Sequence, residues 1–209
     1  MKNRKILLSI ILVLFSFVGL TSCKSSLVSN ITSINPKEEY NAEELALNKK
    51  CALEIIETTI STDVTYVIIG RNTCPYCKLY VPAYSMIFDD LNIELNYFDV
   101  KGINVEDYDD EGKAFYKYSE YKTLVEYLNV DNYAIDNGYM RMSNFNNNGI
   151  KSSLPWLYVP RLYKMQNGKI IGQLSVEEDH QQDENGFKHF SKKQAKSLIS
   201  KVQSFIQED

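Results

Sequence analysis

Residues 64–100 read VTYVIIGRNTCPYCKLYVPAYSMIFDDLNIELNYFDV, and this stretch decides the fold. Its opening run is rich in β-branched residues, which is typical of a buried strand. Residues 77–91 carry apolar side chains at spacings of three and four, which predicts a helix with one continuous apolar face. Residues 93–100 alternate enough to predict a second core strand. Cys74 and Cys77 therefore lie where a strand turns into a helix.

Three further helices are predicted outside this stretch. Asn41 followed by Glu44 resembles a capping box, and an apolar stripe continues from there to about residue 59. Residues 112–129 carry a similar stripe. Ser191 opens a last helix whose apolar residues keep clean helical spacing to the end of the chain.

A hairpin is the other regular element that the sequence predicts. Asn167-Gly168 separates two strand-like runs at 161–165 and 169–176, and an Asn-Gly pair in that position is the strongest short hairpin signal. Residues 131–153 are polar and rich in Asn, which favours a loop. Residues 177–190 are expected to be a polar connection.

The N-terminus looks like an export signal over residues 1–22. A short basic head precedes Ile6–Leu20, which has no charge and is short for a membrane-spanning helix. Leu20-Thr21-Ser22-Cys23 resembles a bacterial lipobox, and the resemblance implies that Cys23 is lipidated and becomes the first residue after cleavage. The alternative is an uncleaved N-terminal membrane helix. Residues 23–37 are expected to form a flexible tether.

Composition places the remainder, residues 38–209, among single globular domains. Hydrophobic residues make up 44% and charged residues 24% of the 209-residue chain. Removal of residues 1–22 leaves about 20 basic against 27 acidic side chains. No cluster of Lys and Arg is interleaved with aromatics, so nucleic acid is not an expected partner. Export would place the domain where disulfides persist.

Three kinds of site fit two cysteines that are three residues apart. A metal site needs more ligands, and Cys51, His180 and His189 do not have ligand spacing, so no metal is expected. A structural disulfide across so short a loop would add little stability. A redox-active dithiol that needs no other cofactor is the favoured interpretation.

The two cysteines are expected to have different roles. Pro75 suits the first helical position, which puts Cys74 at the N-cap, where unpaired N–H groups and the positive end of the helix dipole favour its thiolate. A lowered thiol pKa makes Cys74 the attacking and leaving sulfur. Cys77 begins the apolar stripe and should be buried, so it would resolve the mixed disulfide.

The chain resembles the thioredoxin superfamily. Cys74-Pro75-Tyr76-Cys77 contains the dipeptide found in glutaredoxins, and Pro82 is a helix proline placed as in thioredoxins. Val159-Pro160 looks like the cis-proline of the family, and residues 167–172 look like its final hairpin. The resemblance implies an α/β thioredoxin-like fold, with a central mixed β-sheet flanked by helices.

The resemblance also assigns residues around the dithiol. Pro160 would lie against the dithiol, and Pro75, Tyr76, Val159 and Pro160 would contact the substrate. An ordinary trans turn proline is the alternative at Pro160.

Two features depart from the family's pattern. An insertion at about residues 101–153 must precede the cis-proline. Ile68 stands where thioredoxins have a buried acid, which leaves open how Cys77 loses its proton.

The function expected from these residues is a thiol-disulfide oxidoreductase, extracytoplasmic and lipid-anchored to the bacterial cell membrane. Its partners would be exported cysteine-containing proteins or peptides and a membrane or extracellular redox partner. The proline-containing dipeptide and Val159 resemble oxidising members of the superfamily, which favours disulfide formation or isomerisation over reduction. The chain is also similar to accessory proteins of bacteriocin maturation.

Two other functions remain open at this point. The first is a thioredoxin-like binding or adaptor lipoprotein without redox turnover. The second is a glutaredoxin-like enzyme that uses glutathione. Cys51 is expected to be a small buried residue of the first helix. His180 and His189 are expected to be solvated.

Overall fold

The computed structural model describes residues 25–61, 63–100, 107–108, 114–115, 119–128, 159–176 and 180–208. The predicted export signal, Cys23 and the predicted loop at 131–153 lie outside these residues. Within the described ranges, no helix has the length and apolar character needed to cross a membrane.

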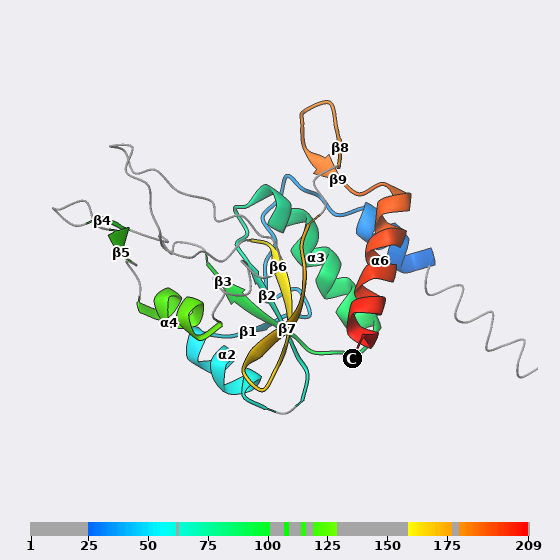
Figure 1. Ribbon diagram of the computed structural model, residues 1–209. Coiled ribbons are helices and arrows are strands. Elements are labelled where there is room, and N and C mark those ends of the chain that lie inside the picture. The colour runs from blue at the N-terminus through cyan, green and yellow to red at the C-terminus, as the bar shows by residue number, and fades with distance from the viewer. Residues whose placement is uncertain are drawn as a thin grey trace, which may run out of the picture.

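The centre of the molecule is a five-stranded mixed sheet in the order β1-β3-β2-β6-β7 (Figure 1). Its strands are β1 (Asn48–Lys49), β2 (Thr65–Gly70), β3 (Leu95–Asp99), β6 (Arg161–Gln166) and β7 (Lys169–Leu174). β3 runs parallel to both β1 and β2. β6 runs antiparallel to both β2 and β7. The predicted strands at 64–69 and 93–100 are therefore confirmed as the two innermost parallel strands.

The β6–β7 hairpin turns at the predicted Asn-Gly pair. Asn167 has φ 51° and Gly168 has φ 71°, so both central residues adopt the left-handed conformation of a type I′ turn. This turn matches the twist of the flanking strands, which explains why two residues are enough to reverse the chain.

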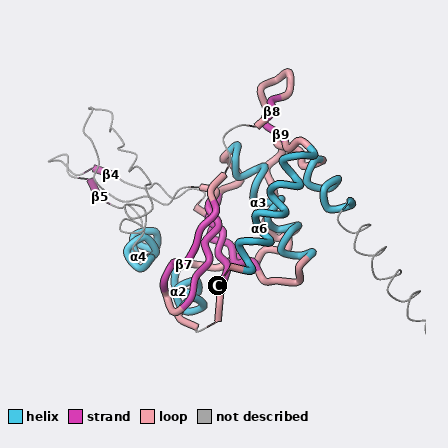
Figure 2. Tube along the Cα trace, turned by 45° about the vertical axis from the view of Figure 1, so that its right-hand side comes forward, coloured by secondary structure: helices cyan, strands magenta, loops and turns pink. Residues whose placement is uncertain are grey.

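Helices cover both faces of the sheet (Figure 2). One face packs against α3 (Pro75–Asp90) and α6 (Lys192–Gln207), and the other against α2 (Ala52–Thr59) and α4 (Ser119–Leu128). Alternation along β2 divides the two cores, because Ile68 faces α3 while its neighbour Ile69 belongs to the α2 and α4 side. The strand order, the strand directions and the helix layers together form a thioredoxin-like α/β fold, as the sequence predicts.

The C-terminal helix is fixed at both ends. The Ser191 hydroxyl accepts the Gln194 N–H at 3.2 Å, while the Gln194 side chain accepts the Ser191 N–H at 3.0 Å, so the predicted capping box is present. At the other end, Lys164 of β6 is buried and its ammonium donates to the backbone carbonyls of Phe205, Ile206 and Glu208. A cation at a helix C-terminus is favourable because it meets the negative end of the dipole.

The predicted start of the first helix is wrong. A helix was expected from residue 41, whereas α2 begins at Ala52 with Cys51 as its N-cap. Asn41 and Glu44 form a local turn closed by the Glu44 N–H donating to the Asn41 carbonyl at 3.1 Å. Turns continue to residue 46, and residues 48–49 then form β1, whose pairing with β3 outweighs the local helical pattern.

Part of the segment predicted as a tether forms a helix instead. Residues 25–32 are helical, and Leu27, Val28 and Ile31 are buried in the same core as α3 and α6. Figure 1 shows this helix in blue beside α6. Its apolar residues fall at spacings of one, three and four, which is a short helical stripe within a Ser- and Asn-rich segment. The expectation of a flexible tether at 23–37 is therefore corrected for this part.

Two other predicted segments differ in detail. Of the helix expected at 112–129, α4 is present and β5 (Ala114–Phe115) pairs with β4 (Asp107–Tyr108). The expected polar connection contains a small hairpin of β8 (Gln181–Gln182) and β9 (Lys188–His189). The remainder of the predicted insertion lies outside the described residues.

The buried N-terminal helix leads to a stability prediction. Ile31 is 0% exposed, so Ile31→Ala should lower the free energy of unfolding by about 2–4 kcal/mol through lost burial and a residual cavity. Asn30→Ala, on the exposed side of the same helix, should change it by less than about 0.5 kcal/mol. Urea unfolding of a chain that begins at Lys24 measures both. Equal effects would show that the helix does not pack as described.

Candidate active site

The two cysteines lie at the point where β2 ends and α3 begins. β2 ends at Gly70, and the Cys74 N–H donates to the Arg71 carbonyl at 3.1 Å, which closes the connecting turn. Cys74 is the N-cap of α3 with extended backbone, and Pro75 follows in the first turn of the helix. A proline there loses no helical hydrogen bond, since the first N–H groups have no partner within the helix.

Cys74 is placed to hold a thiolate. Its Sγ accepts the Cys77 backbone N–H at 3.5 Å. The pKa of Cys74 is lowered to about 6, mainly by a hydrogen bond from the Cys77 side chain, with further help from the Cys77 backbone N–H and the positive charge of Arg71. These effects outweigh the desolvation that opposes ionisation. Cys74 is buried, with 8% of the residue exposed.

Cys77 has the opposite environment. It is 0% exposed within the core between α3 and the sheet, and the Arg71 N–H donates to its Sγ at 3.5 Å. Burial is the main reason why the pKa of Cys77 is raised, and the neighbouring Cys74 raises it further. Both cysteines are free thiols in this structure. One sulfur is therefore poised to ionise while the other stays protonated.

The segment before β6 faces Cys74. The Val159–Pro160 peptide bond is cis, as predicted. The Cys74 thiol lies 3.8 Å from the Val159 carbonyl, which can accept its proton in a hydrogen bond. Pro160 is buried, and Val159 is partly exposed beside the thiol. Four of the predicted site residues, Cys74, Cys77, Val159 and Pro160, are thus brought together from segments more than 80 positions apart.

Tyr76 has a partner that the sequence did not indicate. Lys188 of β9 lies 3.8 Å from the centre of the Tyr76 ring and donates to its hydroxyl. The β8–β9 hairpin stands at the end of α3 that carries the cysteines (Figure 1). The sequence feature that could have indicated the hairpin is the Asn-Gly pair at 185–186, which lies in a stretch that otherwise looks like a polar connection.

His180 is buried, contrary to the expectation that it is solvated. Its Nε2 atom lies 2.6 Å from the Tyr80 hydroxyl, and its ring makes edge contacts with Tyr76 and Phe190. The rings of Tyr76 and Tyr80 from α3 and of Phe190 contact the imidazole, which explains its burial. His189 is partly exposed.

Cys51 is exposed, so the expectation of a small buried residue is also wrong. Its N–H donates to the Glu54 side chain at 2.7 Å at the start of α2. An N-cap residue lies outside the helical stripe, which explains why it is not part of the core.

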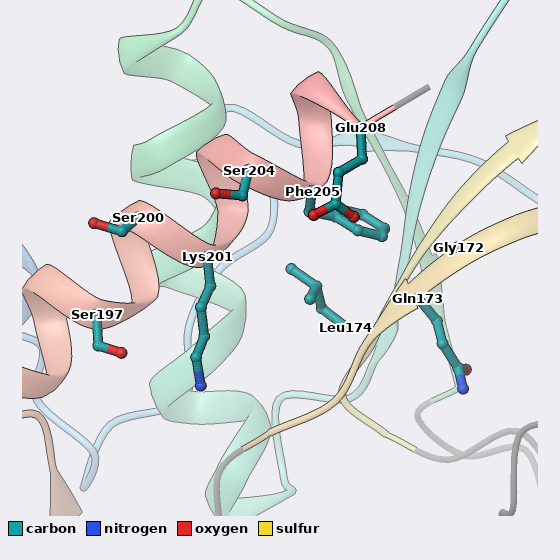
Figure 3. A pocket seen from close by; sticks show the side chains of 9 residues that line it. All are labelled: Gly172, Gln173, Leu174, Ser197, Ser200, Lys201, Ser204, Phe205 and Glu208. Carbon is teal, nitrogen blue, oxygen red and sulfur yellow. The ribbon is translucent and has the colours of Figure 1, made fainter.

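The other features of the described residues do not add to this site. No group of three or more His, Cys, Asp or Glu side chains in the described ranges could hold a metal ion. A hollow of about 550 Å³ lies between β7 and α6 and is lined by several serines and by Lys201 (Figure 3). None of the predicted site residues lines it.

Comparisons with known proteins are sparse. No family model matches the chain, and no curated protein matches it. A solved structure, described as a thioredoxin-fold protein proposed to be an oxidoreductase, is 11% identical. The match covers 65% of this chain and 87% of that chain with a TM-score of 0.36. The fold assignment therefore rests on the strand order and helix layers described above.

The environment of Cys74 makes a prediction for its reactivity. Alkylation by iodoacetamide should show a midpoint near pH 6, because the thiolate is the reacting form and remains populated down to that pH. Cys77 should stay unmodified across the same range. Mass spectrometry of the Cys51→Ser protein, which retains a good N-cap residue, measures both sites.

Two charge-neutralising variants test whether Arg71 contributes to the lowered pKa of Cys74. Arg71→Gln should raise the midpoint by about 0.5 pH unit, since an exposed charge contributes modestly. Lys78→Gln removes the same charge from α3, where Lys78 donates to the Lys37 carbonyl, and should leave the midpoint unchanged. A midpoint near that of free cysteine in the parent protein would contradict the assigned environment.

Proposed function

We propose that the protein is a thiol-disulfide oxidoreductase that exchanges disulfides with exported proteins or peptides through Cys74 and Cys77. The observation that carries the proposal is the asymmetry of the dithiol. Cys74 is an N-cap thiol of lowered pKa with 8% of the residue exposed, while Cys77 is fully buried, has a raised pKa and lies one helical turn away. Cys74 would form the mixed disulfide, and Cys77 would resolve it.

The same two sulfurs can work in either direction. In the reducing direction, the Cys74 thiolate attacks a client disulfide, and Cys77 then displaces the client thiolate as the Cys74–Cys77 bond forms. In the oxidising direction, a client thiolate attacks Cys74 of the disulfide, and Cys77 leaves. A stabilised Cys74 thiolate favours the reduced enzyme and therefore supports the oxidising direction, because it makes the disulfide easier to reduce. Disulfide formation or isomerisation is the direction that we propose.

The substrate would bind beside Cys74 and the Val159–Pro160 segment. The Val159 carbonyl already lies beside the Cys74 thiol, and the ring of Tyr76 is held by Lys188 at the next position of α3. Pro75 is exposed beside them. Pro75, Tyr76, Val159 and Pro160 would therefore contact the polypeptide that surrounds the client cysteine, with no cofactor beyond the dithiol.

Activity assays on scrambled ribonuclease and on insulin test the proposal. Cys74→Ser should abolish disulfide reshuffling and insulin reduction, because it removes the sulfur of lowered pKa that would form the mixed disulfide. Cys77→Ser should retain the attacking sulfur and accumulate a mixed disulfide with the client, visible by non-reducing electrophoresis.

Cys51→Ser is the matched control for these assays. It removes the exposed thiol of α2 and should leave both activities unchanged. Activity that survives Cys74→Ser would remove the assigned roles. A parent protein that binds cysteine-containing clients without reshuffling them would instead be a binding or adaptor protein.

The membrane attachment is part of the same proposal. Cys23 would carry the lipid anchor and place the dithiol outside the cytoplasm, supplied with electrons or oxidising equivalents by a membrane or extracellular partner. Cells fed an alkyne-tagged fatty acid should label the parent protein, whereas Cys23→Ala should lose more than about 90% of the label and accumulate the uncleaved precursor. Full labelling of Cys23→Ala would contradict the anchor.

A further inference from the structure

The thiol of Cys77 faces a proton-transfer problem that α3 itself does not solve. Its sulfur must lose a proton when it attacks Cys74 and regain one when it leaves. It is fully buried, and burial raises its pKa. A proton carrier has to come from a neighbouring element.

The strand next to β2, which is β3, carries polar side chains on the face that packs against α3. In the parallel pair β2–β3, Ile68 is opposite Tyr97 and Gly70 is opposite Asp99. Residues two apart on a strand share a face, so Tyr97 and Asp99 lie on the face that packs against α3. The apolar Ile68 thus has a polar neighbour across the ladder.

Gly70 brings a second tyrosine close to Cys77. A Cβ atom at Gly70 would lie 3.2 Å from the Tyr40 hydroxyl, 3.4 Å from the Tyr97 ring and 3.0 Å from Val81 of α3. The next residue is Arg71, whose N–H contacts the Cys77 Sγ at 3.5 Å. The Tyr40 hydroxyl therefore occupies the space beside Gly70, one residue away from the amide that holds the sulfur.

The two hydroxyl groups form a connected pair. Tyr40 and Tyr97 are joined by a hydrogen bond of 2.8 Å, and Tyr97 also shares a side-chain hydrogen bond with Asp99. Burial is the main reason why the pKa of each tyrosine is raised, so both hydroxyls stay protonated near neutral pH. Protonated hydroxyls both donate and accept, which suits them to pass a proton on rather than to keep it.

The pair reaches solvent through a cavity. Tyr40, Tyr97 and Asp99 line a cavity of about 380 Å³ together with Asn72 and Lys49. Lys49 of β1 lies 3.6 Å from the Asp99 carboxylate, which is partly exposed. A carboxylate at this position can exchange protons with water.

We propose that Tyr40, Tyr97 and Asp99 form a proton path for Cys77, in which the two hydroxyls connect the buried thiol to the Asp99 carboxylate at the cavity. As Cys77 Sγ attacks Cys74 Sγ, the new S–S bond forms, the bond from Cys74 to the client sulfur breaks, and the client leaves as a thiolate. The proton of Cys77 moves along the path to Asp99. In the opposite direction the path returns a proton to the leaving Cys77 sulfur. This inference rests on the proposed redox function.

A purely electrostatic role for Asp99 predicts the opposite effect of its removal on the rate of the resolving step. The charged or titratable groups around the path are Cys74 and Arg71 near the sulfur, and Lys49, Glu39 and Glu43 at the cavity. If Asp99 acted only through its negative charge, its removal would make the Cys77 thiolate easier to form and would speed the resolving step. If it accepts the proton, its removal slows that step.

Stopped-flow reaction with 5,5′-dithiobis(2-nitrobenzoate) separates the two steps. The reduced full chain in detergent solution, with Cys23 and Cys51 changed to Ser in every protein, should release one thionitrobenzoate as Cys74 forms the adduct. It should release a second as Cys77 resolves the adduct. Tyr40→Phe and Asp99→Asn should each slow the second release at least tenfold at pH 7. The difference in this rate between each variant and the parent should shrink toward pH 9–10, where hydroxide can take the proton of Cys77.

Matched variants in β2 and directly before β3 act as controls. Tyr66→Phe removes a hydroxyl that binds the Ile206 carbonyl, and Glu94→Gln removes a carboxylate paired with Lys50, so neither should alter the second release. A second release that is unchanged or faster in Asp99→Asn, or slowed only in proportion to the first, would overturn the proton path. An adduct at Cys74 that forms no faster than with free cysteine would instead overturn the proposed function.

Discussion

The contact of Cys77 with the Cys74 sulfur, to which Cys77 donates from its thiol and from its backbone N–H, is the interaction on which the site depends. It exists because Cys74 ends the extended backbone after β2 and caps a helix whose first amides lack partners. The geometry that gives Cys74 this donor also turns Cys77 inward, since it stands at the start of the buried stripe of α3. One local feature, a strand entering a helix through Cys-Pro-Tyr-Cys, therefore produces both the reactive and the protected sulfur.

Much of this could be predicted because the decisive pattern is local. The β2–α3–β3 unit, the Asn167-Gly168 turn and the capped α6 each have a strong signal within a few residues. The predicted site residues Cys74, Pro75, Val159 and Pro160 lie where the sequence led us to expect them. The Ser- and Asn-rich stretch at 25–32 misled because composition suggested a linker, while three apolar side chains were enough to hold a helix on the core.

Interactions between distant segments could not be predicted. β1 is two residues long and exists through its pairing with β3, so the helix expected from residue 41 starts only after it. The burial of His180 and the contact of Lys188 with Tyr76 require the β8–β9 hairpin to fold back on α3, which no periodicity in 177–190 shows. The same holds for the Tyr40–Tyr97 pair, whose members are 57 residues apart and meet through the space that Gly70 leaves.

The helix at 25–32 has a consequence for where such a protein can act. It begins at residue 25 and its apolar side chains join the core of α3 and α6, so a single residue of sequence separates it from Cys23. With a fatty-acylated Cys23, the domain would sit directly on the bilayer in a restricted set of orientations. Its range of capture would then be about the size of the domain, and only polypeptides passing close to the lipid surface would meet the dithiol.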